Sequence, residues 1–495
     1  MAKAPGFATS SLLGLLGLAA GYLSQYAFNV SAARVISSAN LAGKVFQTIA
    51  FVQFLALLSR AGLDRVSLRT FGAAHGLRDG TNLTDLWKRI NLWVLGLSVL
   101  ICGTAYAFRI PILTALKLPA DDPSLPLLFF AGPFLALSFT ASQALRGVGW
   151  VGRATVAQLT LVFAPPALII AGMKLAGGIS LSTLILIFVG FTAVAAGFGY
   201  YWTLRGIERT VPKVDLETLS TATTSTRIPS GASSFFLLGL LGYAQAGLEI
   251  VLLGTWSNTV EVTRYIATAR TAMFVGLGLV AIASVLGRLY AAAHARQDLK
   301  EMRETLDKAG RWALSFAVLS GGCLLLGHQL ILDLFGIYFP NALLCFGAIL
   351  VGHTVNAGAG GLFLLLQMTG RERASTICLV AATSIAMVAY WFLIPAYGAV
   401  GAASGLSILI ILWNLFMAYV AKREYNLQPF SSRLIPSLGM LLCSYLAAYW
   451  VKPIGTGAIL AVVIYFIAAL PVVWTAFLNE QERSAIVLLL RRLKK

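Results

Sequence analysis

The chain has 495 residues, of which 58% are hydrophobic and only 11% are charged, and its mean hydropathy is +0.82. A water-soluble domain cannot bury this much apolar surface, so the composition excludes a soluble globular protein and indicates a membrane protein. The formal charge of +18 would suit a nucleic-acid partner, but most of the 37 basic residues lie in alternate loops between apolar runs. This is the positive-inside pattern. We therefore expect no nucleic acid, and we expect the basic loops to contact anionic membrane lipids.

The apolar runs are each long enough to cross a bilayer, which takes about 20 residues, and we count about fourteen. The first is longer than a signal-peptide core and is expected to be retained. An even number of spans, with the basic loops inside, predicts a multi-pass protein of the bacterial inner membrane with both termini in the cytoplasm. The runs are 10–34, 42–63, 89–111, 125–146, 154–175, 182–203, 233–254, 264–288, 311–332, 341–366, 375–395, 398–421, 433–451 and 456–477.

The chain repeats itself at the start of its second half. "SSLLGLLGL" at 10–18 resembles "SSFFLLGLLGY" at 233–243, and these stretches open the first and seventh runs. Six spans form an even number, so both halves start on the same side and the repeat is parallel. The predicted fold class is therefore an all-α polytopic membrane protein with two six-helix lobes around a central cavity and two extra C-terminal helices. The predicted parts are an N-terminal lobe (1–204), a polar linker (205–232), a C-terminal lobe (233–424), and the last two spans with a basic tail (425–495).

Two ionisable residues lie inside adjacent predicted spans. Arg270 lies about two turns from the outer end of span eight, and Glu249 lies about one turn from the outer end of span seven. A charge at the centre of a spanning helix costs about 2.5–3.5 kcal/mol, so such residues usually face a partner or a wet cavity. The pair could be a structural salt bridge, or Arg270 could be a cationic group in an outward-reaching cavity. The two interpretations are compatible if the substrate breaks the pair.

A polar stripe runs along span one and continues at the start of span two. Its amide and phenol groups recur with helical spacing, and they would have no partners if they faced lipid. We therefore predict that the stripe lines a basic, hydrogen-bonding cavity on the outer half of the membrane. The alternative for its two cationic members is that they reach out to the outer interface. The residues are Tyr22, Gln25, Tyr26, Asn29, Arg34, Lys44 and Gln47.

Span ten contains "GHTVNAGAGG" at 352–361. His353 and Asn356 share a helical face near the midplane, and the glycines permit close helix contact or local unwinding. The histidine could be a hydrogen-bonding link between helices or could carry a proton in ion coupling, together with Asn356 and Glu249. A further segment, 293–311, predicts an amphipathic interfacial helix with Leu299, Met302 and Leu306 on one face.

No pattern of catalytic or metal-binding residues is present. We find no Walker-type loop, no paired carboxylates in a span, no H-E-x-x-H and no G-x-S-x-G. The five cysteines are scattered singly, which indicates packing rather than metal ligands or disulfides. The sequence thus predicts no catalytic residues, no metal and no cofactor. A membrane glycosyltransferase or ligase would be expected to carry a large loop with paired acids, which this chain lacks. Transport is the better interpretation.

An ordered set of short stretches resembles the polysaccharide-transporter (O-antigen flippase, Wzx-like) branch of the multidrug/oligosaccharidyl-lipid/polysaccharide (MOP) exporter superfamily. The resemblance covers almost the whole chain. Relatives often have Asp where this chain has Glu249, and they commonly have a proline near 283–290, which is absent here. The stretches are "LLSRAGLDRVSLR" (57–69), "QALRGVGWVGRA" (143–154), "RYIATAR" (264–270), "LDLFGIYFPNA" (332–342), "QMTGRERAS" (367–375) and "YGAVGAASG" (397–405).

The resemblance implies a transporter that moves undecaprenyl-diphosphate-linked oligosaccharide across the inner membrane by alternating access. It also implies a role in surface polysaccharide or lipopolysaccharide export, with polymerase and chain-length proteins as partners. Arg270 would then receive the anionic diphosphate, because guanidinium groups bind phosphate oxygens bidentately. An H⁺ or Na⁺ counter-flow would supply the energy. The alternatives are an ion-coupled exporter of small molecules, a flippase for the peptidoglycan precursor, and a helper without transport activity.

Overall fold

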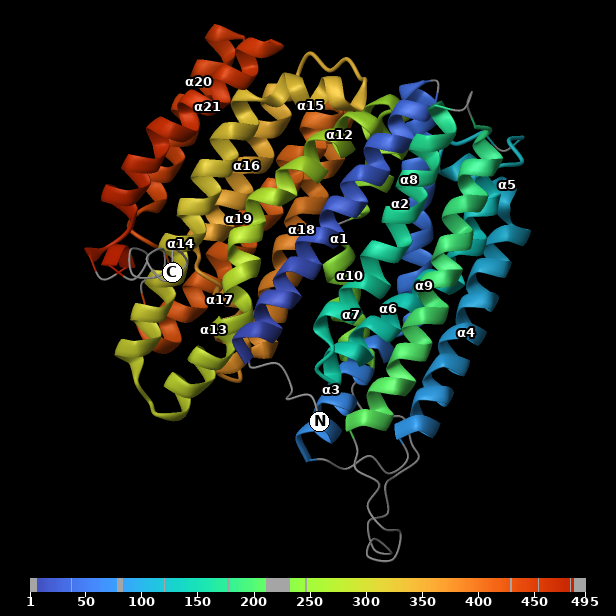
Figure 1. The fold of residues 1–495 in the computed structure, drawn as a ribbon, viewed down its shortest axis with the longest axis horizontal. Coiled ribbons are helices and arrows are strands. Elements are labelled where there is room, and N and C mark those ends of the chain that lie inside the picture. Colours follow the sequence, from blue (N-terminus) through green and yellow to red (C-terminus); the bar gives the residue numbers. More distant parts are fainter. Residues whose placement is uncertain are drawn as a thin grey trace, which may run out of the picture. The chain divides into compact units, whose positions relative to one another are not determined.

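The computed structural model describes residues 7–36, 38–77, 83–119, 121–175, 179–210, 232–244, 247–427, 430–452, 454–480 and 482–484. Within these ranges every regular element is a helix. Among the described residues, ten helices are long and apolar enough to cross a membrane, and the bent pair α16 and α17 can form one more span. Each predicted apolar run coincides with one helix or with consecutive helices separated by a short break. The predicted all-α, multi-pass fold class is confirmed (Figure 1).

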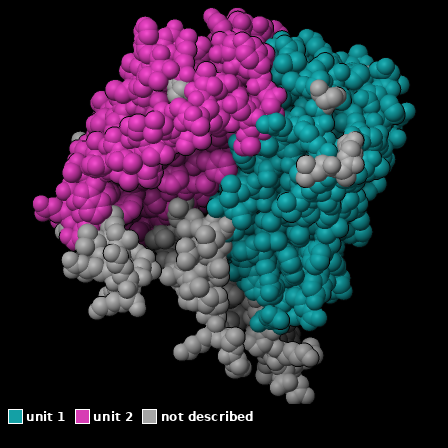
Figure 2. Space-filling view, turned by 45° about the horizontal axis from the view of Figure 1, so that its top comes forward, with its two compact units in different colours: residues 1–263 teal, residues 264–495 magenta. Residues whose placement is uncertain are grey.

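The chain divides into two compact units, residues 1–263 and 264–495 (Figure 2). Helix α12 contains the boundary between them. The boundary between these units, at residues 263 and 264, differs from the lobe boundaries that the sequence repeat predicts. The two six-helix lobes stay a prediction. Most of the predicted linker, residues 211–231, lies outside the described residues, and α9 includes 205–210.

Unit 1 contains the first spans and two short helices, α3 and α5, that the apolar runs did not predict. The turn between α2 and α3 is set by Ala61 and Gly62, which both have a left-handed backbone. This turn returns α3 against α6, where Phe71 packs on Gly147. Its helices are α1 (Phe7–Val35), α2 (Ala39–Arg60), α3 (Leu63–Leu77), α4 (Leu83–Ala107), α5 (Arg109–Ala115), η1 (Leu125–Phe130), α6 (Ala131–Gly147), α7 (Val151–Thr155), η2 (Val156–Thr160), α8 (Leu161–Leu175), α9 (Leu181–Thr210), α10 (Ala232–Ala244), α11 (Leu248–Trp256) and the start of α12 (Thr259–Ala272).

Two irregular segments interrupt spans of unit 1. Residues Val156–Thr160 form a π-helical turn, η2, between α7 and α8. It directly precedes α8, which contains Pro165 and Pro166, two residues that cannot donate backbone hydrogen bonds. Such π turns are often found at functional sites. The second irregular segment is Gly247, directly before α11, whose backbone is not helical (φ −166°).

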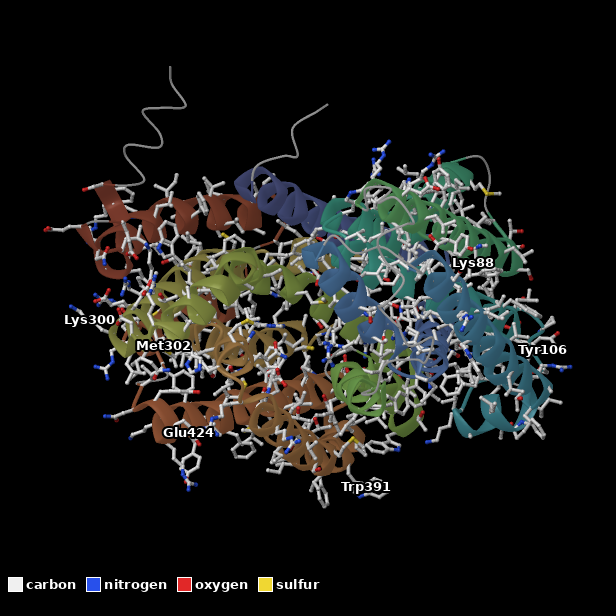
Figure 3. The ribbon with its side chains drawn as sticks, turned by 90° about the horizontal axis from the view of Figure 1, so that it is seen from below. Lys88, Tyr106, Lys300, Met302, Trp391 and Glu424 are labelled. Atoms are coloured by element: carbon white, nitrogen blue, oxygen red, sulfur yellow. The ribbon has the colours of Figure 1, made fainter. Side chains whose placement is uncertain are left out.

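Unit 2 contains the rest of α12 and the later spans. Span eight is interrupted by the 3-10 turn η3, although the sequence has no proline there. Trp391, on α18, points outward from this unit and is 62% exposed, as expected of a lipid-facing side chain (Figure 3). The elements are η3 (Met273–Gly276), α13 (Leu277–Ala295), α14 (Leu299–Leu326), α15 (His328–Phe335), α16 (Ala342–Gly358), α17 (Leu362–Met368), α18 (Glu372–Tyr397), α19 (Ala399–Tyr425), α20 (Leu434–Val451), α21 (Thr456–Val472) and η4 (Val473–Phe477).

The predicted separate interfacial helix at 293–311 is wrong in its bounds. Helix α13 ends at Ala295, and α14 begins at Leu299 and continues as one helix to Leu326. Asp298 caps it, because its Oδ1 accepts a 2.9 Å hydrogen bond from the Glu301 N–H. The polar first turns are therefore an extension of span nine.

The last two spans, α20 and α21, pack on α14. Glycines on α14 allow the close approach: a Cβ at Gly322 would lie 2.1 Å from the Tyr465 ring. The Tyr465 hydroxyl donates a 2.8 Å hydrogen bond to the Val318 carbonyl. Both spans bury few of their residues within the protein, so most of their surface is left for lipid.

Candidate functional site

A partly buried polar cluster lies in unit 1 where α6 ends beside the π-helical turn η2. Arg146 Nη2 donates a 3.0 Å hydrogen bond to Gln158 Oε1, and Ser142 Oγ donates to the same oxygen at 3.1 Å. Ser142 and Arg146 are one helical turn apart on α6, so their side chains lie on the same face. The cluster thus consists of a guanidinium, an amide and a hydroxyl within a membrane-spanning part of the chain.

One N–H group of the Arg146 guanidinium lacks a hydrogen-bond acceptor among the described residues. Its Nε is buried, and among the described residues no hydrogen-bond acceptor reaches it. Thr160 Oγ1, on η2, is in the same state within the described part of the chain. A buried donor without an acceptor costs about 1–3 kcal/mol, and more when it is charged. Such a group in a spanning segment is a candidate for binding an anionic or hydroxyl-bearing ligand.

Helix α1 brings part of the predicted stripe to this cluster. Tyr22 interacts electrostatically with Arg146. The preceding residue, Gly21, allows the approach, since a Cβ there would lie 2.9 Å from the Leu159 side chain of η2. Gln25 and Tyr26 are also partly buried, and Asn29 is buried. The intervening Leu23 is 56% exposed, so the polar stripe lies on the protein-facing side of α1.

Gln47 lies elsewhere in unit 1 and is fully buried. Its Nε2 donates to the Leu116 carbonyl at 2.9 Å and contacts Thr255 Oγ1 at 3.4 Å. A Cβ at Gly254 would lie only 2.1 Å from its amide carbon, so α11 packs directly onto this side chain. These contacts link α2 to α11 and to the turn after α5.

The remaining predicted residues of unit 1 lie nearer the ends of their helices. Arg34 is exposed, and its carbonyl accepts a 2.6 Å hydrogen bond from Lys174 Nζ. Lys44 is partly buried on α2. Glu249 is buried in the first turn of α11 and interacts electrostatically with Tyr243 of α10. The Tyr243 hydroxyl in turn donates to the Ala50 carbonyl at 2.9 Å.

The predicted residues of unit 2 lie around η3 and α16. Arg270 is partly buried near the end of α12, and its Nη1 lies 3.4 Å from Met273 Sδ in η3. His353 faces the other end of this turn, because a Cβ at Gly276 would lie 4.0 Å from its Nδ1. Glu249 belongs to unit 1 and Arg270 to unit 2, so their pairing stays a prediction.

Asn356 belongs to a partly buried amide pair. Asn414 Nδ2, on α19, donates to Asn356 Oδ1 at 3.1 Å. The glycines of this segment allow both a close helix contact and a break in the helix, as predicted. Gly352 packs against Ser407 on α19, and the helix breaks at Gly360 and Gly361, which have positive φ values, with a bend of 40° before α17.

The sequence interpretation missed Arg146, Ser142 and Gln158 as members of a site. Arg146 is the last residue of the predicted apolar run 125–146, a position where an arginine usually reaches the membrane interface. The available signals were the i, i+4 spacing of Ser142 and Arg146 and the short turn that returns Gln158 to the same level. Within the described residues, no group of three or more His, Cys, Asp or Glu side chains could hold a metal ion.

The sequence matches no family model, and no curated protein sequence is significantly similar. Several solved structures, however, share the fold. The lipid II flippase MurJ in an inward closed conformation matches with a TM-score of 0.66 at 13% identity, covering 94% of this chain and 98% of that chain. An inward-facing multidrug resistance MATE family transporter of the MOP superfamily matches with a TM-score of 0.60 at 13% identity, covering 83% and 98%. The chain has the MOP transporter fold.

A third solved structure with this fold is of interest because of its binding pocket. It is a MOP superfamily transporter from Pyrococcus furiosus, with a TM-score of 0.55 at 15% identity, covering 89% of this chain and 96% of that chain. Its binding pocket is described as having a reversed polarity that suggests a different function. The superfamily-level resemblance expected from the sequence is thus supported by the fold. The polysaccharide-transporter branch stays a prediction.

Proposed function

We propose that this chain is a MOP-type flippase that moves undecaprenyl-diphosphate-linked oligosaccharide from the inner to the outer leaflet of the bacterial inner membrane by alternating access. The observation that carries the proposal is Arg146, a partly buried arginine in the last turn of a candidate span, whose buried Nε has no acceptor among the described residues. The diphosphate is a multivalent anion, and planar guanidinium donors suit its oxygens.

The groups around Arg146 fit such a ligand. Ser142, Gln158 and Tyr22 offer hydroxyl and amide groups, which suit either phosphate oxygens or sugar hydroxyls. The π-helical turn that carries Gln158 and Thr160 loosens the helix where a ligand would enter. Arg270, partly buried in unit 2, would provide a second cationic contact later in the transport cycle, with Glu249 as its partner when no substrate is bound.

We propose that an inward H⁺ or Na⁺ flow drives the cycle. His353, Asn356 and Glu249 are the groups assigned to coupling, because each is at least partly buried in or beside a spanning helix. His353 faces η3, where span eight is broken, so its protonation could alter that turn. A transport rate that does not respond to imposed proton or sodium gradients would refute coupling.

The test is a flipping assay with purified protein in liposomes that carry a diphosphate-linked polyprenyl sugar on one face. Appearance of the lipid on the other face is followed for wild type, Arg146→Ala and Arg146→Lys. Loss of charge-assisted hydrogen bonds worth about 1.5–3 kcal/mol predicts a rate reduced on the order of 10- to 100-fold for Arg146→Ala. Lysine should restore only part of the rate, because it lacks the planar fork.

The matched control is Arg69→Ala, which removes an exposed arginine from the same unit. It should flip lipid at the wild-type rate. If Arg146→Ala, folded and monodisperse, behaves like this control, the anion-binding role is refuted. Arg270→Ala tests whether Arg270 also contacts the substrate. If this variant flips lipid at the wild-type rate, Arg270 has only a structural role.

Two other substrates have support in the comparisons. The fold match to the lipid II flippase covers 94% of this chain, against 83% for the inward-facing MATE transporter, a difference of 11% of the chain. Both neighbours are covered to 98% of their own length, so this difference reflects chain length, and the fold match keeps the peptidoglycan precursor as a candidate. A small-molecule exporter would be favoured if several diphosphate-linked lipids stay in place with wild type while a cationic dye is transported.

A further inference from the structure

Two arginines lie around one tryptophan at the basic end of unit 1. The Arg153 guanidinium carbon is 4.1 Å from the centroid of the Trp150 ring, and that of Arg209 is 5.8 Å from the same ring. Arg153 belongs to α7 and Arg209 to the last turn of α9, so the indole joins two cations from separate helices. Both arginines are exposed, and Trp150 is partly buried.

The backbone fixes this tryptophan in place. Gly149 has φ +82°, a left-handed conformation that reverses the chain directly after α6. The Trp150 N–H then donates a 2.8 Å hydrogen bond to the Leu145 carbonyl. On the other side the ring lies beside α9, because a Cβ at Gly206 would be 3.7 Å from it, an ordinary van der Waals distance.

The local charge is strongly positive. Among the described residues, neither Arg153 nor Arg209 has a carboxylate within 4.0 Å. The nearby Arg205 does have one, since its Nη1 lies 3.4 Å from Glu208 Oε2. Its guanidinium also lies 5.6 Å from the Tyr201 ring. Two guanidiniums that lack a carboxylate partner within the described ranges, held by one ring, form a preorganised anion site.

We propose that Trp150, Arg153 and Arg209 bind the phosphate of an anionic phospholipid headgroup. Arginine forks bind phosphate oxygens bidentately, and tryptophan is favoured at membrane interfaces, where one side of the ring is apolar and the other wet. The site lies at the ends of two spanning segments. Val151, the residue after Trp150, is apolar and 39% exposed, and it offers a surface for the acyl chains. This surface selects a lipid over free phosphate.

The experiment measures lipid binding to the full-length purified chain by native mass spectrometry, with phosphatidylglycerol or phosphatidylcholine added in turn. The ratio of their dissociation constants reports headgroup preference. Arg153→Gln/Arg209→Gln is compared with Lys300→Gln/Lys308→Gln, which removes the same two charges from exposed positions of α14 in unit 2. Because each basic residue near an anionic surface contributes on the order of fivefold, the arginine double variant should lose about tenfold or more of the preference. The lysine double variant should change it less than about twofold.

Trp150→Leu tests the aromatic support without changing the charge, and it should also weaken phosphatidylglycerol binding. Inorganic phosphate, added at equal concentration, should not displace phosphatidylglycerol. The proposal is overturned if the two double variants lose the preference equally, since charge alone would then explain it. It is also overturned if wild type shows no preference, or if inorganic phosphate displaces the lipid. Binding at this site does not depend on the transported substrate, so the outcome is independent of the flipping assay.

Discussion

Glu482 connects the end of the last span to α14, and its removal should destabilise unit 2. The carboxylate is buried and accepts hydrogen bonds from Arg311 Nη2 at 3.0 Å, from Trp312 Nε1 at 3.1 Å and from the Asn479 N–H at 2.9 Å. Asn479 Oδ1 accepts in return from the Glu482 N–H at 3.1 Å, which completes a capping box. The perturbation is Glu482→Ala.

The expected magnitude follows from these contacts. Breaking a buried ion pair costs about 3–5 kcal/mol. Arg311 keeps a second partner, Asp307, so the cost should lie near the lower limit, about 3 kcal/mol. Unit 2 spans 495 − 263 = 232 residues, for which each kcal/mol shifts Tm by about 2–4 °C. The predicted fall in Tm is therefore about 6–12 °C.

The assay is thermal unfolding in detergent, followed by tryptophan fluorescence, with Glu480→Ala as the control. Glu480 is exposed and only two residues away, so its removal should change Tm by no more than about 1 °C. Equal shifts for the two variants would refute the reasoning, because the ion pair would then contribute nothing to stability.

The same contacts predict a pH dependence. Burial raises the pKa of Glu482, but the hydrogen bonds from Asn479, Arg311 and Trp312 outweigh burial and lower the pKa below its ordinary value. A lowered carboxyl pKa stabilises the folded state above the unfolded value of about 4.3, and that contribution is lost as the pH falls toward the folded pKa. Glu482→Gln does not titrate and should lose less stability than wild type on acidification below about pH 5. Parallel acid profiles for the two proteins would contradict this.

Two further predictions concern packing. Tyr465→Phe removes the hydroxyl that donates to the Val318 carbonyl and should cost about 1 kcal/mol in unfolding free energy, whereas the exposed Tyr449→Phe should be neutral; a chemical denaturation series distinguishes them. Gln47→Leu leaves the Leu116 carbonyl without this donor and should lower the unfolding free energy by about 1–3 kcal/mol, and a wild-type Tm for a folded variant would show that the carbonyl finds another donor.

The spans were predictable from the sequence because each needs only a long apolar run, which local composition fixes. Breaks within the spans were harder to predict from the sequence. The break at Gly360 and Gly361 was signalled by its glycines, whereas η3 in span eight has neither a proline nor a glycine before Gly276 and depends on tertiary packing. The bounds of α14 were mispredicted for a related reason. Its polar first turns resemble a surface helix, yet Met302 and Leu306 are buried in unit 2, so packing extends the span beyond its apolar part.

The position of Arg146 could not be predicted from the sequence. The side chain of an arginine at the end of an apolar run can lie at the membrane interface or inside the protein. The hydropathy pattern of the sequence is the same in both cases. Arg146 and Arg153 flank one short turn, yet Arg146 donates to Gln158 within the unit while Arg153 lies exposed against Trp150. Gly149, which has a positive φ, lies between the two arginines and ends the helical segment of Arg146, so that Arg153 belongs to a separate helix, α7. A basic loop can thus supply one residue to an internal anion site and the next to the lipid surface, and the two roles are separable by single substitutions.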